Sequence, residues 1–397
     1  MDIHPAVRLD ETLLTDTAAT YRRIAAGGPV QYAELPGGEQ GWLVMGYDQA
    51  RALLDDPRLS KDIRTARTVL RLNGPEWHSP MVEHMLNTDR PEHTRLRRLV
   101  SKGFTARTVA ALRPAIEALT DGLLDAMGDE GRTDLVESFA FPLPIAVISE
   151  MLGVPHEDRE RIREWTGALV TNDPPGSAGQ AFAALAGYLT GLIERKRAEP
   201  AQDLVSALVL ASDEGDQLTA QEVLIMIGIL IVAGHETTVS LISSAVHSLV
   251  RHPDQLGLLR SDRSLLPGAI EEVLRFDSPV HMASLRFTTE PVTVAGVTIP
   301  RHELVRIALP AANRDESRFP EPDRFDITRD TRGHLAFGHG IHFCLGAPLA
   351  RLEAEIAVGK LLDRYGRLEL DVPQEDVTWR PSEIVHSLRS LPIAYGR

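Results

Sequence analysis

The sequence predicts a mainly α-helical fold with a small β region. From residue 47 to residue 274 the apolar residues recur with the 3.6-residue period of amphipathic helices. The signals of strands are confined to a β-rich subregion made of residues 29–46 and 280–310. The chain has 397 residues, of which 43% are apolar and 25% charged, as in an ordinary globular protein. Since we find no internal repeat and no low-complexity linker, we expect a single domain over residues 1–397.

The individual elements follow from periodicity and local stop signals. A Gly-Gly-Pro stop ends the first helix, and a Pro-Gly-Gly turn separates the first two strands. Helices are expected at residues 18–26, 48–54, 91–104, 109–127, 144–151, 181–196, 220–249, 264–275 and 347–364. Strands are expected at residues 30–35, 41–45, 292–299 and 303–308. Residues 64–86, 171–179 and 313–337 are irregular, and long loops in a compact domain are either disordered or functional.

Charge and hydropathy argue against several classes of protein. The chain has 56 acidic and 42 basic residues and a net charge of −14, which argues against nucleic acid as the main partner, because that binding needs an excess of Lys and Arg. The N-terminus lacks the basic and apolar regions of a secretory signal. The longest apolar run, residues 223–234, would span roughly 18 Å as a helix, against about 30 Å for a bilayer core. We therefore expect a cytoplasmic protein with a buried core helix and no membrane anchor.

Cys344 is the single cysteine of the chain, so neither an intrachain disulfide nor a zinc site with several thiolates is possible. A lone cysteine is commonly a small buried hydrophobic residue. This one lies in the segment Phe337-Gly338-His339-Gly340-Ile341-His342-Phe343-Cys344-Leu345-Gly346, just before a predicted helix. The free N–H groups and the dipole of that helix start favour a thiolate. Gly346 and Ala350 lie on one face of the helix and leave room for a flat group, so Cys344 suits an axial ligand of haem iron.

This segment resembles the haem-binding loop of the cytochrome P450 family, whose signature is Phe-Gly-x-Gly-x-His-x-Cys-x-Gly, and every fixed position matches. The resemblance implies the cytochrome P450 fold, a triangular prism of helices around haem b. It implies that Cys344 is the proximal thiolate ligand of the iron. Electron donation by this thiolate assists cleavage of the O–O bond. The chain looks closest to soluble bacterial enzymes that hydroxylate macrolides and other polyketides.

The apolar helix carries a second motif, Ala233-Gly234-His235-Glu236-Thr237-Thr238. An acid and two hydroxyls inside a buried helix need partners, because an unsatisfied buried polar group costs about 1–3 kcal/mol. A metalloprotease His-Glu-x-x-His helix is excluded, since Val239 replaces the second histidine. Hydroxyls that bond back to the preceding turn remain a structural alternative. The motif resembles the oxygen-activating segment of the family. The resemblance implies that Gly234 lets the helix approach the haem closely. It also implies catalytic roles for Thr237, which would hydrogen-bond dioxygen and water, and for Glu236, which would relay protons.

Glu272 and Arg275 lie three residues apart on a predicted helix, which alone is an ordinary pair worth roughly 0.2–0.5 kcal/mol. In the family, a pair of this spacing meets an arginine from a Pro-x-Arg-Phe segment. The resemblance assigns that position to Arg324 and implies that these three residues form a structural clamp on the loop before Cys344, with no catalytic role.

A third motif precedes the helix expected at residues 91–104. Asp89 followed by Glu92 predicts a capping box at the helix start. His93 and Arg97 are four residues apart and share a face, which on its own can be a solvated basic face. The resemblance makes both of them ligands of the haem propionates, where charge-assisted hydrogen bonds are strong. The full set of haem contacts that it implies is His93, Arg97, Gly234, Thr237, Thr238, Arg286, Ala336, Phe337, Gly338, His342, Cys344, Gly346 and Ala350.

The resemblance also implies a substrate pocket above the haem with mostly aliphatic walls. Its expected lining residues are Leu86, Val232, Ala233, Val280, Met282, Ala283, Leu285, Ile384 and Val385. Because aromatic residues make up only 5% of the chain, a bulky, mostly aliphatic natural product with a few oxygens fits better than a stacked aromatic substrate. We expect a monooxygenase that inserts one atom of O2 into this small hydrophobic substrate by hydroxylation or epoxidation.

Electrons are expected from another protein, because the sequence shows neither a Gly-rich dinucleotide fingerprint nor the cysteines of an iron–sulfur cluster. We expect an acidic ferredoxin, with its reductase, to dock on the cysteine side of the molecule. The basic residues that would attract it are Arg95, Arg98, Lys102 and Arg351.

Other functions remain open on the sequence. Steroid and vitamin-D-type hydroxylases share the same overall pattern. A peroxygenase would use hydrogen peroxide directly, but related peroxygenases replace the acid–alcohol pair that is intact at Glu236 and Thr237. A non-catalytic haem protein that senses a gas or recruits a partner would not need complete catalytic motifs. A cysteine peptidase would leave the glycine pattern around Cys344 unexplained.

Overall fold

The fold is built around one long helix, α12 (Ala220–Arg251), in a computed structural model that describes residues 6–9, 16–35, 38–72, 74–78, 82–171, 174, 176–213, 218–382 and 384–397. A capping box starts this helix: the Glu222 amide donates to the Thr219 hydroxyl at 3.2 Å, and the Thr219 amide donates to the Glu222 carboxylate at 2.7 Å. The helix is apolar on nearly all sides, as buried helices are. It is long and apolar enough to cross a membrane, but 72% of its apolar stretch is buried inside the protein, so it is a core helix.

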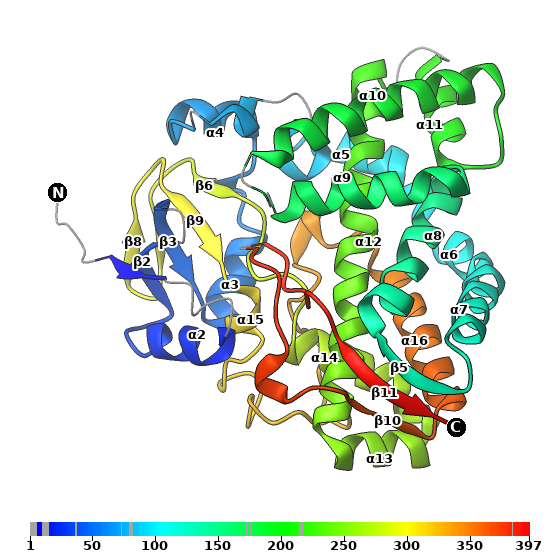
Figure 1. The fold of residues 1–397 in the computed structure, drawn as a ribbon. Helices are drawn as coiled ribbons and strands as arrows, with labels where there is room; N and C mark the ends of the chain where they lie inside the picture. The colour runs from blue at the N-terminus through cyan, green and yellow to red at the C-terminus, as the bar shows by residue number, and fades with distance from the viewer. Residues whose placement is uncertain are drawn as a thin grey trace.

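Most of the remaining helices surround α12, whereas α2, α3, α4 and α15 lie beside the strands on the left (Figure 1). They are α2 (Thr17–Ala25), α3 (Tyr47–Leu54), α4 (Ile63–Val69), α5 (Glu92–Val100), α6 (Ala106–Ala111), α7 (Arg113–Met127), α8 (Pro142–Leu152), α9 (Arg159–Thr171), α10 (Ser177–Ala198), α11 (Leu204–Asp213), α13 (Pro253–Ser261), α14 (Leu266–Phe276), α15 (Leu309–Ala312) and α16 (Ala347–Arg364). Of these, α8, α10, α14 and α16 pack directly against α12 and bury its apolar faces.

The strands of the described residues form three sheets. The first has the order β1-β2-β3-β9-β6-β4, from β1 (Val7–Arg8), β2 (Val30–Glu34), β3 (Gln40–Val44), β4 (Leu59–Ser60), β6 (Arg286–Thr288) and β9 (Leu304–Ile307). The second has the order β10-β11-β5, from β5 (Glu130–Asp134), β10 (Arg367–Leu370) and β11 (Pro392–Gly396). The third is the hairpin of β7 (Val292–Val294) and β8 (Val297–Ile299). The six-stranded sheet lies on the left of the helical body in Figure 1 and unites residues 29–46 with residues 280–310.

Most of the expected elements are confirmed within a few residues, and α16 coincides with the predicted helix. The helix expected at 109–127 is divided at Leu112 into α6 and α7. The strand expected at 292–299 is a hairpin, because Ala295 (φ 48°) and Gly296 (φ 78°) form a left-handed turn inside it. Irregular segment 64–86 contains α4, while its residues 73 and 79–81 lie outside the described residues, as do 172, 173 and 175 of segment 171–179. The elements that were not expected also include α9, α11, α13 and α15 and the strands β1, β4, β5, β6, β10 and β11.

Candidate active site

The loop before α16 presents Cys344. Gly338 and Gly340 both have φ of 72°, which glycine adopts without steric cost. A Cβ atom on Gly340 would lie 2.1 Å from a carboxylate oxygen of Asp55, so no other residue fits there without a shift. The Cys344 amide donates to the Phe337 carbonyl at 2.9 Å and closes the loop. The cysteine is exposed, at the point where α16 begins.

The sulfur of Cys344 lies among groups that favour its anion. Although the residue is accessible at the surface, the protein atoms around its sulfur keep water away and raise the pKa of the thiol, and this effect dominates. Hydrogen bonds from the amides of Gly346 and Ala347, and the charges of Arg97 and Arg351, act in the opposite direction and lower the pKa. Amides of a helix start that point at a sulfur are a typical setting for a thiolate ligand.

Two residues in the middle of α12, Ala233 and Thr237, are accessible to solvent, and we call this part of the helix the window. Ala233 is exposed and Thr237 half-buried, one turn apart on one face of a helix whose other residues are mostly buried. The Thr237 hydroxyl donates to the Ala233 carbonyl at 3.0 Å, so the back-bonded arrangement that the sequence left open is confirmed. A Cβ atom on Gly234 would lie 2.9 Å from the Ile148 side chain, so its small size serves the packing of α12 on α8, and its approach to the haem stays a prediction. Thr238 is buried.

Glu236 lies on the buried side of α12, with a 2% exposed side chain. It contacts the imidazole of His235 and the guanidinium of Arg380, each at 3.4 Å. Burial alone would raise its pKa, but the hydrogen bond and charge of His235, followed by the charges of Arg380 and Arg163, lower the pKa below its usual value. Glu236 also borders a surface depression of about 310 Å³ that contains Arg163, Glu164 and Arg380. The carboxylate is therefore ionised and lies next to a path to solvent.

The four expected propionate ligands converge, although they come from three distant segments. His93 is 3% exposed, and its ring lies 4.2 Å from the ring of His342, between centroids. Arg97 reaches the same loop and donates to the Phe343 carbonyl at 2.6 Å. Burial, and then the charges of Lys61, His93, Arg286 and Arg97, lower the pKa of His342 far below its usual value. The cluster is thus positively charged and buried.

Lys61 is a member of this cluster that sequence reasoning missed. Nothing in the segment around it signals a site, because lysine is the residue type most often found on the surface. Only the pairing of β4 with β6 carries it inward, to a 2% exposed position beside Arg286.

The clamp on the cysteine loop uses a different arginine from the one expected. Glu272 and Arg275 are both completely buried and joined by hydrogen bonds of 2.7 and 2.8 Å. The third arginine is Arg329, whose Nε lies 3.3 Å from Glu272. The assignment of Arg324 is wrong: its side chain is 58% exposed and pairs with Glu321 and Asp326, and only its backbone carbonyl accepts from Arg275.

The capping box expected at Asp89 and Glu92 is also absent from this part of the structure. α5 begins at Glu92 after Pro91, and no side chain caps it. Asp89 instead accepts the backbone amide of Lys61 at 3.0 Å and the hydroxyl of Ser60. Asp89 therefore anchors the end of β4 to the start of α5.

The expected substrate residues divide into two groups. In one group, Val280 and Val385 are joined by a β-bridge, and neighbouring Ile384 has a side chain that is 59% exposed. Val232 and Ala233 belong to the window of α12, and Leu86 is half-buried in the turn Met85–Asn87.

The second group packs into hydrophobic clusters. Met282 is buried in the same cluster as Leu43, and its sulfur accepts from the Tyr21 hydroxyl at 3.8 Å. Ala283 packs with the sheet residue Val305, and Leu285 packs with Phe287. The three residues therefore belong to three different hydrophobic clusters.

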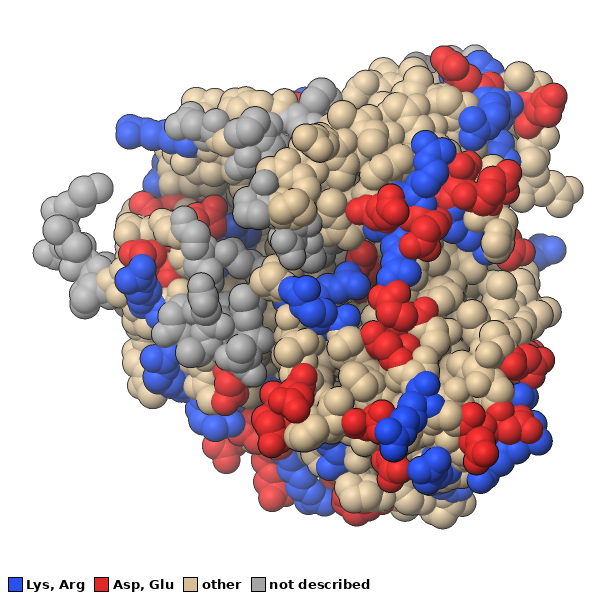
Figure 2. Space-filling view, in the orientation of Figure 1, with Lys and Arg blue, Asp and Glu red and all other residues tan. Residues whose placement is uncertain are grey.

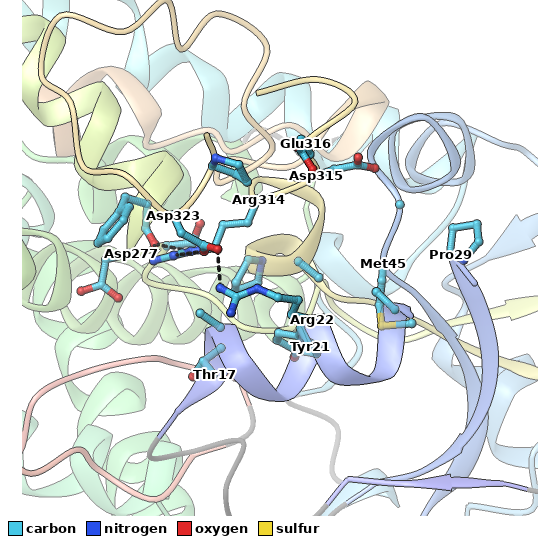
Figure 3. A pocket seen from close by; sticks show the side chains of 18 of the residues that line it. Thr17, Tyr21, Arg22, Pro29, Met45, Asp277, Arg314, Asp315, Glu316 and Asp323 are labelled. Carbon is cyan, nitrogen blue, oxygen red and sulfur yellow. Dashed lines mark hydrogen bonds and ion pairs between the residues drawn. The ribbon is translucent and has the colours of Figure 1, made fainter. Parts of the chain in front are cut away.

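A recess of about 940 Å³ lies elsewhere, between α2, α15 and the loop that follows α15. Figure 3 shows Arg22, Arg314 and Asp323 converging in it. Arg314 pairs with Asp323 at 2.8 Å, and Arg22 pairs with the same carboxylate. Of the expected site residues only Arg324 lines this recess, so it is separate from the cysteine site.

The described residues fit haem b at the cysteine site. The buried Nδ1 of His93 and Nε2 of His342 have no hydrogen-bond partner among them. Neither Arg286 nor Lys61 forms an ion pair with a described carboxylate. Buried donors of this kind need an anion, and the haem propionates supply carboxylates beside an exposed thiol that can ligate iron.

Comparison with known proteins agrees with this geometry. The family model for cytochrome P450 matches residues 177–389. Cytochrome P450 monooxygenase PikC of Streptomyces venezuelae is 51% identical over 98% of this chain and 93% of its own. Vitamin D(3) 25-hydroxylase of Pseudonocardia autotrophica is 47% identical over 95% of this chain and 93% of its own.

Among solved structures, the tirandamycin C-bound P450 monooxygenase TamI superimposes with a TM-score of 0.93 and 44% identity, over 98% of this chain and 99% of that one. The expected fold and cofactor are therefore confirmed. The chain belongs to the cytochrome P450 family, the monooxygenases that hold haem through a cysteine thiolate.

Proposed function

We propose that this monooxygenase hydroxylates or epoxidises a bulky, mostly aliphatic macrolide or other polyketide in the cytoplasm. The observation that carries the proposal is the chemistry of the accessible side chains around the cysteine site. Ala233 and Ile384 are exposed and Val280 is half-buried, and all three side chains are aliphatic. The tirandamycin C that TamI binds supports the same class of substrate.

The experiment is a binding panel on the ferric enzyme. A macrolide, a linear polyketide and a secosteroid are titrated, and the shift of the Soret absorption reports displacement of water from the haem. We expect the macrolide or polyketide to bind at least roughly tenfold more tightly than the secosteroid, about 1.4 kcal/mol. Tighter binding of the secosteroid would contradict the proposed class and favour the vitamin-D-type alternative, which one relative supports.

The haem, when bound, supplies the activation of O2. Proton delivery is what we assign to the residues of α12. Glu236 borders the solvent-facing depression beside Arg380 and can take up protons there. Thr237 follows it in sequence and lies half-buried on the window side, where its hydroxyl can pass a proton toward the reacting oxygen. Neighbouring residues of one helix point in different directions, so this pair can connect the two sides of α12.

Replacing Thr237 by Ala is expected to uncouple electron use from product formation. Without the hydroxyl, proton delivery to the reacting oxygen is no longer directed. We therefore expect product per electron to fall by about tenfold or more and peroxide release to rise. Oxygen uptake, peroxide and product are measured together. Thr190→Ala is the matched control, because the Thr190 hydroxyl makes the same bond to the fourth preceding carbonyl, at 2.9 Å, on the remote helix α10. Unchanged coupling in Thr237→Ala would remove the role of Thr237.

The electron donor that we propose is an acidic ferredoxin with its reductase. Two of the four basic residues expected at its docking surface are engaged within the protein: Arg95 pairs with Glu92 and Glu222, and Arg351 pairs with Glu271. On the face drawn in Figure 2, Lys and Arg side chains are interspersed with Asp and Glu, which does not favour an acidic partner there.

Arg98 and Lys102 are the better candidates for docking. Both are exposed, on α5 and the turn that follows it, and α5 contacts the cysteine loop through Arg97. Reversing both to Glu should slow reduction by an acidic ferredoxin by about tenfold or more at low salt, with the difference vanishing as salt rises. Stopped-flow reduction measures this. The double variant Arg23→Glu/Arg301→Glu makes the same change in net charge at exposed positions in the N-terminal region and the β8–β9 turn. Equal slowing in both double variants would exclude a local docking surface.

A further inference from the structure

Lys61 is the one buried lysine of a chain that has only four. It is 2% exposed, whereas Lys102 is exposed and Lys196 and Lys360 are half-buried. A buried ammonium is costly unless an anion or several acceptors compensate it. Among the described residues its Nζ makes one hydrogen bond, to the Ser284 hydroxyl at 2.5 Å, and no ion pair. Its charge therefore lacks a partner of opposite sign in direct contact.

The strand register places Lys61 opposite another cation. β4 runs antiparallel to β6, with Leu59 facing Thr288 and Ser60 facing Phe287. The next position of this register brings Lys61 opposite Arg286. Directly opposed side chains of an antiparallel pair lie on the same side of the sheet, and like charges there destabilise the pair. Both side chains converge on Ser284, because Arg286 donates to its carbonyl at 2.8 Å.

Asp89 does not neutralise this pair by contact. Its carboxylate accepts the backbone amide of Lys61 and the hydroxyl of Ser60, so it holds the strand end rather than the ammonium. Burial and then the charge of Arg286 lower the pKa of Lys61 well below its usual value, while Asp89 raises the pKa by less. A further anion is needed to keep Lys61 charged at this place.

The neighbours of Lys61 identify that anion. Asp89 joins Lys61 to His93, because its carboxylate accepts the Lys61 amide at 3.0 Å and its carbonyl accepts the His93 amide at 2.8 Å. The ring of His93 lies 4.2 Å from the ring of His342, between centroids. Within the part of the chain that the structure describes, His93 Nδ1 and His342 Nε2 are buried and have no hydrogen-bond partner. Lys61, His93, Arg286 and His342 therefore come together from the end of β4, from α5, from β6 and from the cysteine loop.

We propose that the ammonium of Lys61 binds a haem propionate directly, beside the guanidinium of Arg286. This adds a ligand to the four that the sequence resemblance implies. It also explains why two cations tolerate opposed positions in one strand pair: a carboxylate between them converts repulsion into two charge-assisted hydrogen bonds. The inference rests on the bound haem and not on the proposed substrate class, so the two can fail separately.

The test compares haem with its dimethyl ester, which has the same iron and ring but no propionate charge. Lys61→Met keeps the length of the side chain and removes its charge. We expect the variant to release ferric haem to excess apomyoglobin roughly tenfold faster than the wild-type protein. When both are reconstituted with the dimethyl ester, we expect equal release rates. A variant that loses both cofactors equally faster would show that Lys61 only supports packing, and this would overturn the proposal, as would unchanged release of haem.

Lys360→Met is the matched control, since Lys360 is a half-buried surface lysine paired with Asp121, and we expect no effect on the release of either cofactor. A second measurement needs no variant. With only four lysines, the labelled Nζ signals of the wild-type ferrous carbon monoxide complex can be resolved by NMR. Exchange of haem for the dimethyl ester should shift the Lys61 signal and leave the other three in place. An unmoved Lys61 signal would overturn the proposal even if Lys61→Met fails to fold.

Discussion

Replacing Cys344 by Ala is expected to abolish the strongly red-shifted Soret band of the reduced carbon monoxide complex and effectively all monooxygenase turnover. The band reports a thiolate bound to haem iron, and the described loop offers this sulfur at the start of α16. The sequence contains no second cysteine, so no other thiolate can rescue ligation. Reduction under carbon monoxide, followed by an absorption spectrum, measures the outcome in minutes.

The control for this experiment lies in the same loop. His339 is half-buried and occupies a variable position of the signature. His339→Ala should therefore keep the red-shifted band, and far-UV circular dichroism should show the same helix content in both variants. A Cys344→Ala protein that retains the band would disprove thiolate ligation by this residue.

Replacing Arg275 by Met is expected to produce the largest loss of stability. Arg275 is completely buried, with two hydrogen bonds to Glu272 and further bonds to the carbonyls of Asn313 and Pro322 at 3.0 and 2.9 Å. Its removal leaves the Glu272 carboxylate buried with weaker compensation, and breaking such a pair costs about 3–5 kcal/mol. Urea unfolding, followed by circular dichroism at equal haem content, measures the change in the free energy of unfolding.

Arg324→Met is the matched control for that measurement. Its side chain is 58% exposed, so we expect a change within about 0.5 kcal/mol. The loss of unfolding free energy in Arg329→Met should lie between those of the other two variants, because Arg329 bonds to Glu272 at the edge of the clamp and its side chain is 11% exposed. If Arg324→Met were as damaging as Arg275→Met, the arginine named from the sequence motif would be the right one and the geometry described here would be incorrect.

Arg324 and Arg329 show which contacts the sequence does not predict. Glu272 and Arg275 share a helix, so their contact follows from spacing alone. Arg324 and Arg329 lie in an irregular segment, where no period decides which side chain turns inward. The same holds for Gly234, because the sequence alone does not show that its Cβ position would meet the Ile148 side chain of α8.

The secondary structure divides in a similar way. The helices α12 and α16 were predictable because their apolar periodicity is long and their ends carry clear signals. The strand β5 was not, since Glu130-Gly131-Arg132-Thr133-Asp134 contains no apolar residue and is a strand only because β11 pairs with it. The chemistry of the site, with Cys344, His93, Arg97, Arg286 and His342, was predictable from motifs, but Lys61 depended on a register that no local pattern reveals.

The pairing of β5 with β11 also sets a limit on how the chain is made. The Leu391 amide bonds to the Asp134 carboxylate, 257 residues earlier in the sequence, and β11 is the middle strand of its sheet. In the six-stranded sheet, Trp42 of β3 likewise pairs with Val305 of β9, which is synthesised much later. The sheet of β5 and β11 cannot form until almost the whole chain has been synthesised, and the six-stranded sheet cannot form before residue 307. Such distant pairing is intrinsically slow. The strands made first therefore stay unpaired for most of the synthesis, and truncation before β11 should leave β5 and β10 without their shared partner.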